Sequence, residues 1–158
     1  MQHGFGESEI SWTTTGKANI ILDNLIEMGK IKPFTLVMSD GMVQEKVGSE
    51  ERLNHVLLER MLVEEIIPMA EKNISLAVGR KPYEQTHLKA MDDPDFNNYF
   101  HTFFRCIGDN DCFRSRFLEE DAIIQEKGVH EIRKIYPGGH DWNVWRPCFA
   151  DFAQMIFR

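Results

Sequence analysis

Two side chains in this sequence have the types and the setting for acid–base chemistry: the carboxylate of Asp111 and the imidazole of His140. Each follows a predicted strand within a few residues, and in a parallel sheet the carboxyl ends of the strands meet at one edge. A carboxylate that fixes the tautomer of a neighbouring imidazole forms the acid and base part of a nucleophilic hydrolase. The spacing therefore predicts that Asp111 and His140 lie together at a candidate catalytic site.

Both residues also have ordinary structural interpretations. Asp111 ends the turn Gly108–Asp111, where an aspartate side chain commonly bonds the turn backbone. His140 follows Gly138 and Gly139 in a segment typical of a surface loop. Spacing alone leaves the catalytic and the structural interpretation open.

The elements that would position these residues alternate between strands and helices in the second half of the chain. We predict a strand over 99–106, a helix over 113–127, a strand over 131–136 and a last helix that includes 145–156. Strands that alternate with helices indicate a parallel sheet with helices packed on its faces.

The first half of the chain is predicted to hold two helices and one strand. We predict a helix over 17–28 with Thr13–Thr15 as cap residues, a buried strand over 34–38, and a long helix from 49 to about 72, bent at Pro68. The stretch 74–98 is weakly patterned and is predicted to be mostly loop. The whole chain, 1–158, is predicted to be a single mixed α/β domain.

Composition narrows the classes of protein to which the chain can belong. It has 18 Lys and Arg residues against 25 Asp and Glu residues, and its formal net charge of −7 argues against non-specific binding to a nucleic acid backbone. No apolar run is long enough to cross a bilayer, and residues 1–10 do not have the pattern of a signal peptide. Three cysteines are too few, and odd in number, for a disulfide framework, and no Cys-x-x-Cys or His-x-x-x-His spacing suggests a metal site.

Several segments resemble the esterase D and feruloyl esterase group of the α/β-hydrolases. Residues 137–146 (PGGHDWNVWR) resemble the histidine motif of this group, and residues 106–111 (CIGDND) resemble its acid turn. Residues 3–12 resemble its oxyanion loop, 19–38 the following helix and strand, and 62–74 the helix before the nucleophile strand. The resemblance follows the chain order and implies a partial α/β-hydrolase fold, with a mostly parallel sheet flanked by helices.

The resemblance implies a role for each matching residue. His140 would be the general base and Asp111 its orienting acid. The backbone N–H of Phe5 would be an oxyanion donor, and Gly6 would let the chain approach the substrate carbonyl closely. Trp142 would line the substrate pocket, and an ordinary core role is the alternative for it. The resemblance implies no metal and no cofactor, and members of the feruloyl esterase kind are commonly exported.

One part of the family's catalytic machinery has no counterpart in the sequence. The family's nucleophile is a serine in a Gly-x-Ser-x-Gly turn between a strand and a helix, and none of the six serines has these flanking glycines. The turn is expected within 74–98, whose 25 residues are fewer than the roughly 30 that a strand–helix–strand unit needs. The sequence therefore indicates that the nucleophile strand, turn and helix are missing, together with the strands that open the fold.

Two other residues are candidate substitutes for the serine. Ser75 is nearest to the missing turn but lacks the glycine two residues before it, and Cys112 directly follows the acid turn. A structural or incidental role is the alternative for both.

The sequence supports three functional interpretations. The chain is predicted to be a carboxylic ester hydrolase of the feruloyl or acetyl-xylan esterase type, with a small-molecule or polysaccharide-linked ester as its substrate. The alternatives are a catalytically inactive remnant or binding module, and an esterase that acts on a small thioester or a siderophore ester. No nucleic acid or membrane partner is expected. A sheet without its inner strands exposes backbone edges, so self-association through these edges is also predicted.

Overall fold

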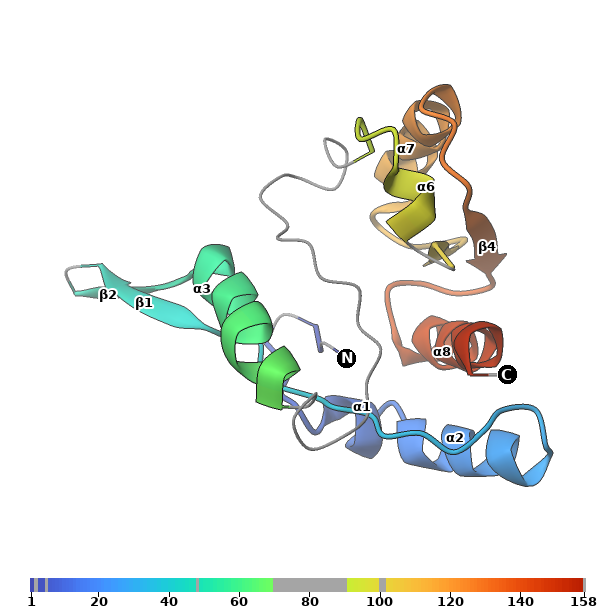
Figure 1. The fold of residues 1–158 in the computed structure, drawn as a ribbon, viewed down its shortest axis with the longest axis horizontal. Coiled ribbons are helices and arrows are strands. Elements are labelled where there is room, and N and C mark those ends of the chain that lie inside the picture. Colours follow the sequence, from blue (N-terminus) through green and yellow to red (C-terminus); the bar gives the residue numbers. More distant parts are fainter. Residues whose placement is uncertain (2, 5, 48, 70–90, 100–101, 158) are drawn as a thin grey trace. The chain divides into compact units, whose positions relative to one another are not determined.

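A computed structural model describes residues 1, 3–4, 6–47, 49–69, 91–99 and 102–157 (Figure 1). The chain divides into two compact units. The first unit comprises Met1–Thr14 and Thr35–Glu84, and the second comprises Thr15–Phe34 and Gln85–Arg158. No helix in the described ranges is long and apolar enough to span a membrane.

The second unit contains a two-stranded parallel sheet. β3 (Phe104–Gly108) pairs with β4 (Ile132–Tyr136), in a register that places Phe104 opposite Ile132 and Gly108 opposite Tyr136. Parallel strands need a long crossover between them, and α7 (Arg114–Glu126) provides it. The predicted mixed α/β class with parallel pairing is therefore confirmed.

One further helix packs against this sheet, and a second packs on that helix to form an apolar core. α8 (Trp142–Ile156) follows β4, and α2 (Ala18–Glu27) packs against α8. Leu25, Ile31 and Ala153 are buried together where α2 meets α8. The spacing of apolar residues in α2 and α8 is amphipathic in the sequence. The predicted helices over 17–28, 113–127 and 145–156 are confirmed within a few residues.

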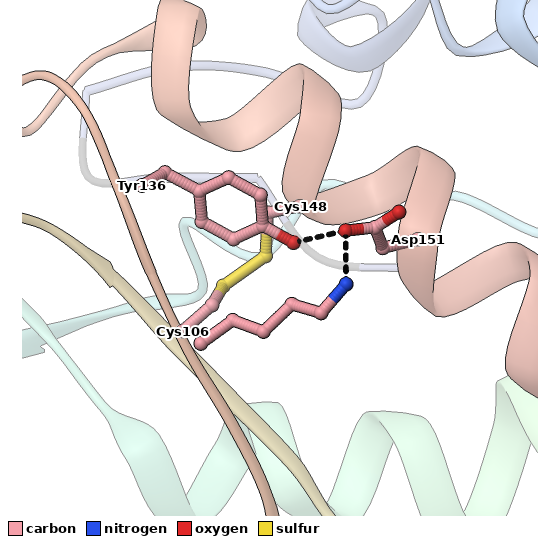
Figure 2. The surroundings of a disulfide bond; sticks show 5 residues. Cys106, Tyr136, Cys148 and Asp151 are labelled. Carbon is pink, nitrogen blue, oxygen red and sulfur yellow. Dashed lines mark hydrogen bonds and ion pairs between the residues drawn. A yellow bond between two sulfur atoms is a disulfide. The ribbon is translucent and has the colours of Figure 1, made fainter.

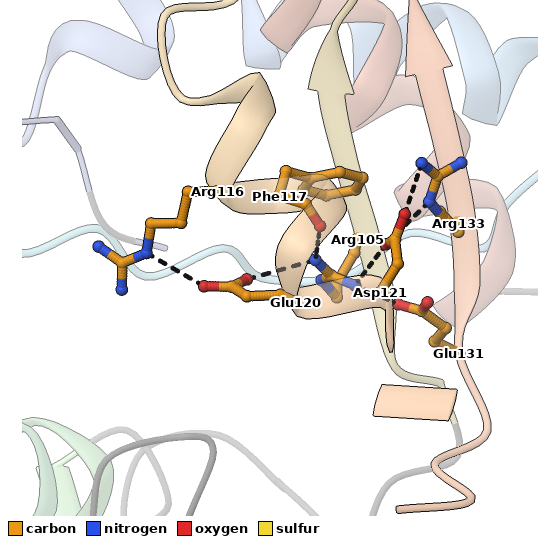
Figure 3. A network of polar contacts seen from close by, with 7 residues as sticks. All are labelled: Arg105, Arg116, Phe117, Glu120, Asp121, Glu131 and Arg133. Carbon is orange, nitrogen blue, oxygen red and sulfur yellow. Dashed lines mark hydrogen bonds and ion pairs between the residues drawn. The ribbon is translucent and has the colours of Figure 1, made fainter. Parts of the chain in front are cut away.

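A partly buried ionic network fixes α7 against both strands (Figure 3). The Arg105 guanidinium on β3 contacts the carboxylates of Glu120, Asp121 and Glu131 at 3.3, 3.1 and 3.0 Å. Its Cζ lies 4.2 Å from the centre of the Phe117 ring. A guanidinium carries five N–H donors in a planar fork, so one side chain can bind several carboxylates at once.

A disulfide between Cys106 of β3 and Cys148 of α8 joins the sheet to the last helix (Figure 2). Next to it, the Tyr136 hydroxyl donates to Asp151 Oδ2 at 2.6 Å, and Lys134 Nζ donates to the same oxygen at 2.7 Å. The low and odd number of cysteines argued against a disulfide framework. It did not reveal this bridge, because the pairing depends on the fold that brings β3 beside α8.

The first unit contains a β-hairpin that the sequence analysis did not predict. β1 (Gln44–Val47) pairs antiparallel with β2 (Glu50–Leu53). The predicted start of a long helix at 49 is therefore wrong. The helix α3 (His55–Arg60) begins only after Asn54, whose side chain accepts a hydrogen bond from the Leu57 N–H and so caps the helix.

The rest of this helical region and the first helix of the chain also differ from the prediction in detail. α3 continues as the π-helix η1 (Met61–Ile66), and the predicted end near 72 lies outside the described residues. The threonines Thr13 and Thr14 lie in α1 (Ser11–Thr14) and donate to the Ile10 carbonyl, so they do not cap α2.

The predicted strand over 34–38 is not formed. Among the described residues, no strand lies beside this segment. A β-strand forms only when its backbone pairs with that of a neighbouring strand. Other contacts hold the segment instead. The terminal ammonium of Met1 donates to the Val37 carbonyl at 2.6 Å, and the Phe34 ring stacks on Phe157.

The predicted strand over 99–106 begins later than expected. α6 (Phe96–Tyr99) occupies its start, and β3 begins only at Phe104. The Asn97 side chain donates to the Gly128 carbonyl and accepts from the His130 N–H, so contacts distant in sequence hold this short helix in place. An aromatic run such as 99–104 fits a helix or a strand by pattern alone, and here tertiary contacts decide. The predicted loop over 74–98 lies largely outside the described residues.

Candidate active site

The acid turn and the histidine loop lie side by side at the carboxyl end of the parallel sheet. The Asp109 N–H donates to the Tyr136 carbonyl at 2.8 Å, and the Asn110 N–H donates to the Gly138 carbonyl at 2.9 Å. In return, the Gly138 N–H donates to Asp109 Oδ1 at 2.9 Å. Because each loop satisfies backbone groups of the other, the two loops are held in a fixed relation.

Glycines at two positions allow this close approach. A Cβ atom at Gly108 would lie 2.3 Å from the Gly138 carbonyl oxygen and 2.7 Å from the Gly139 carbonyl oxygen, which no side chain can do without moving backbone. Gly138 has a φ of 131°, a conformation that favours glycine. The two loops therefore pass each other so closely that only glycine fits at positions 108 and 138.

Asp111 and His140 are in direct contact at this edge. His140 Nδ1 lies 2.9 Å from Asp111 Oδ2. The Asp111 side chain is only 4% exposed, whereas the His140 side chain is 51% exposed. A buried carboxylate thus holds an imidazole whose other side is open to solvent. This is the arrangement of an acid that orients a base.

The surroundings of Asp111 favour its charged form. Burial works against ionisation, but hydrogen bonds from the Phe113 N–H, the His140 ring and the Cys112 thiol outweigh it and lower the pKa of the Asp111 carboxyl below its ordinary value. The Phe113 bond, of 2.8 Å, goes to Oδ1 and leaves Oδ2 for the imidazole. Because an ionised carboxylate only accepts hydrogen bonds, Nδ1 of His140 carries the proton, and the lone pair of the neutral ring is on Nε2.

Two aromatic side chains contact the exposed imidazole, and a third packs against one of them. The centres of the Phe113 and Trp145 rings lie 5.1 and 5.0 Å from the centre of the His140 ring, with interplanar angles of 72° and 84°. Trp142, which the resemblance predicted to line the substrate pocket, packs edge-on against Trp145 at 5.0 Å. The sequence predicted only that Phe113 and Trp145 lie in helices, and their periodic spacing gave no sign of a contact with His140.

The predicted oxyanion segment belongs to the first unit. Phe5 lies outside the described residues, and Gly6 is exposed with a φ of 76°. The segment is fixed by His3, which is buried. His3 Nε2 accepts from the Gly41 N–H at 2.9 Å, and Nδ1 lies 2.8 Å from the Gly4 carbonyl oxygen. His3 Nε2 also lies 3.2 Å from Asp40 Oδ1, so His3 links the segment around Gly4 to the segment around Gly41.

Neither candidate substitute nucleophile is placed opposite His140 by a described contact. Ser75 lies outside the described residues, and the exposed Cys112 contacts the Asp111 carboxylate. Within the part of the chain that the structure describes, His140 makes its side-chain hydrogen bond to Asp111 and to no serine. No group of three or more His, Cys, Asp or Glu side chains in these ranges could hold a metal ion.

A hollow of about 320 Å³ lies at the opposite end of the sheet. Its lining includes Phe103 and Ile132, which are next to or within the amino-terminal ends of β3 and β4. Ligands of parallel sheets bind beyond the carboxyl ends of the strands, and the hollow does not include His140 or Asp111. The candidate active site is therefore the edge that carries the His140–Asp111 contact.

Comparison with known proteins places the chain among esterases. No family model matches it. Its structure is similar to that of a ferulic acid esterase, with a TM-score of 0.73 and 17% identity over 99% of this chain and 83% of the other. The chain therefore has the fold of an α/β-hydrolase type of esterase. Its sequence is 47% identical, over 190 aligned residues that include all of this chain, to an endo-1,4-beta-xylanase/feruloyl esterase of Xylanibacter ruminicola. The chain belongs to the feruloyl esterase family of hydrolases.

The chain is much shorter than this relative and shorter than the aligned stretch. The chain spans 26% of the Xylanibacter protein. The aligned stretch has 190 positions whereas the chain has 158 residues, so at least 32 positions of the alignment have no residue of this chain.

Proposed function

We propose that the chain carries the acid and base of a carboxylic ester hydrolase of the feruloyl or acetyl-xylan esterase type, with His140 as the general base and Asp111 as its orienting acid. The observation that supports this most directly is the 2.9 Å contact between His140 Nδ1 and the buried Asp111 carboxylate. The substrate would be an ester of a small molecule or of a polysaccharide, and the reaction needs no cofactor.

The proposed chemistry follows from the tautomer of His140. With its proton on Nδ1, the ring presents the basic Nε2 lone pair on its exposed side. Nε2 removes a proton from the attacking hydroxyl group and returns it to the leaving alcohol, and the Asp111 charge stabilises the imidazolium formed in between. The N–H of Phe5 and the adjacent Gly6 are proposed to stabilise the oxyanion, and Trp142 is proposed to contact the acyl group.

The nucleophile is the part that this chain is proposed to lack. The sequence has no Gly-x-Ser-x-Gly turn, and the alignment positions without a residue of this chain are about as many as a strand, turn and helix require. Without a serine, His140 can only assist the attack of water on the ester. We therefore expect hydrolysis far slower than that of an enzyme with the full triad, and without a burst of acylation.

Hydrolysis of p-nitrophenyl acetate and methyl ferulate tests the proposal. We expect slow turnover by the purified chain that is lost in His140→Ala and reduced in Asp111→Asn, because the neutral amide no longer fixes the Nδ1–H tautomer. His130→Ala is the matched control, since His130 lies at the other end of the sheet, beside the hollow. Equal rates in the chain, in His140→Ala and in buffer would contradict catalysis by His140.

A catalytically inactive remnant or binding module is the second candidate function. Within the described ranges, no serine side chain forms a hydrogen bond with His140, and this favours the second candidate. In that case methyl ferulate is expected to change the fluorescence of Trp142 and Trp145 without being hydrolysed. The same assays with a small thioester or a siderophore ester test the other substrate classes. Activity that disappears in Ser75→Ala or in Cys112→Ser would instead identify a substitute nucleophile.

A further inference from the structure

We infer that Phe113 and Trp145 are positioning residues for His140: their rings form an aromatic clamp that keeps Nδ1 on Asp111 and Nε2 toward the open side. The catalytic role of this clamp rests on the proposed function. The clamp itself is a property of the free protein, and it can be measured without a substrate.

One hydrogen bond is a weak restraint for a half-exposed ring. His140 is 51% exposed, and its polar contact in the described part of the chain is the single bond to Asp111. The outer torsion of a histidine side chain has broad and shallow preferences. An imidazole held only by this bond would swing about this torsion and lengthen its contact with the carboxylate. Further contacts are needed to hold the plane of the ring.

Two rings approach the imidazole from separate elements. Phe113 comes from the turn that follows Asp111, and Trp145 comes from the first turns of α8. Both meet the imidazole nearly edge to face, at 72° and 84°, with ring centres about 5 Å away. This is the favoured geometry of aromatic pairs. A rotation of the imidazole plane would break both contacts together.

Each of the two rings is itself held in place. The Phe113 N–H donates to Asp111 Oδ1, so the residue that covers the imidazole also fixes the carboxylate that binds it. The Trp145 N–H donates to the Asp141 carbonyl, and the Trp145 ring packs on Trp142. Phe113 nevertheless leaves 54% of its surface exposed. The contact of its ring with His140 therefore lies at the surface and is not part of the buried core.

The test is an NMR measurement on the whole chain labelled with ¹⁵N-histidine. The native chain is expected to show a protected Nδ1–H resonance for His140, with nitrogen shifts of a single Nδ1–H tautomer. In Phe113→Leu and in Trp145→Leu this proton is expected to exchange with water roughly threefold to tenfold faster, the factor that the loss of one aromatic pair implies. The resonances are also expected to report a mixture of tautomers. Trp145→Phe keeps an aromatic ring and is expected to restore most of the protection.

Phe152→Leu is the matched control, because Phe152 is an α8 aromatic that stacks on Phe104 of β3 and its loss removes a ring contact of the core. If the control speeds exchange as much as Trp145→Leu, the effect is one of general stability and the clamp is refuted. An absent Nδ1–H resonance in the native chain, or unchanged exchange in both clamp variants, also refutes it. If Trp145→Leu does not fold, Phe113→Leu decides alone, since its ring is exposed. A failure of His140→Ala to change hydrolysis would refute the proposed function and leave this measurement unaffected.

Discussion

At the scale of single residues, the candidate site depends on the distance between two loops. Gly108 ends β3, and its missing side chain lets the histidine loop pass directly over it. Asp111 lies in the acid turn after β3, and His140 lies in the histidine loop after β4. An added methyl group at Gly108 would push the two loops apart and would therefore lengthen the 2.9 Å contact between the two side chains.

We expect Gly108→Ala to destabilise the fold by roughly 1–3 kcal/mol, the usual cost of forcing an extra carbon into a packed place. The new Cβ would lie 2.3 Å from the Gly138 carbonyl oxygen, and a backbone atom cannot turn away as a side chain can. Urea unfolding measures the loss, and the His140 Nδ1–H resonance is expected to weaken with it.

Gly139→Ala is the control within the same loop. Its Cβ would come no closer than 3.6 Å, to the Asp141 carboxylate, which is an ordinary contact. A loss of stability as large as that of Gly108→Ala would show that the loop tolerates no side chain anywhere. The explanation by close approach would then be wrong.

At the scale of elements, the disulfide and the Asp151 contacts connect the sheet to α8. β3 leads into the acid turn, and α8 begins just after His140. Cys106 and Cys148 are 42 residues apart, and the loop that they close contains both Asp111 and His140. The elements that carry the two site residues are therefore joined covalently behind the site.

Cys148→Ser is expected to lower the free energy of unfolding by about 4 kcal/mol, because opening a loop of this length restores entropy to the unfolded chain. Cys106→Ser should cost the same, and the double variant no more than either single one, since all three remove one bridge. Urea unfolding with and without reductant measures this. Cys112→Ser leaves the bridge intact and should unfold like the native chain. Additive losses from the two bridge cysteines would contradict the assignment of the pair.

The contact between β4 and α8 predicts a pH dependence at alkaline pH. Burial, together with the hydrogen bond and charge of Asp151, raises the pKa of the Tyr136 hydroxyl well above its ordinary value. Above about pH 10 the unfolded chain releases this proton and the folded chain keeps it, so stability falls as the pH rises. Urea midpoints between about pH 9 and pH 11 should therefore fall more steeply in the native chain than in Tyr136→Phe.

An ultraviolet titration checks the same contact directly. Of the three tyrosines in the chain, one should remain protonated well beyond the others, and Asp151→Asn should bring its titration to a lower pH. If all three ionise together in the folded chain, the Tyr136–Asp151 bond does not exist in solution.

At the scale of the whole molecule, the small parallel sheet has strand edges whose backbone groups can pair with another chain. β3 and β4 form a two-stranded sheet, so within the described ranges each has one edge without a strand partner. Ile132 and Ile135 of β4 are 42% and 39% exposed. Unpaired edges with apolar side chains favour pairing with another chain.

We therefore expect the purified chain, of 18.4 kDa, to sediment as a mixture with species larger than the monomer. Ile135→Lys should shift the distribution toward the monomer, because a charge on an edge strand opposes pairing. Ile10→Lys is the control, since Ile10 is also exposed but lies in no strand. A monomer that melts cooperatively would contradict this prediction.

The sequence by itself determined the parts of the fold that depend on local interactions. The helices α2, α7 and α8 were predictable, because their hydrogen bonds and apolar faces arise within a few turns of one chain segment. Asp111 and His140 could be identified as neighbours because each directly follows a strand of one parallel pair. In this case local pattern and topology together were enough to find the candidate site.

The tertiary structure alone decided everything that needs a partner distant in the sequence. The segment 34–38 has the composition of a strand and finds no neighbour, while Gln44–Val47 and Glu50–Leu53 pair without a strong strand pattern. The Cys106–Cys148 bridge and the rings around His140 also join positions whose proximity no spacing encodes. The physical reason is that strand pairing, disulfides and ring contacts gain their free energy only after the chain has brought separate segments together.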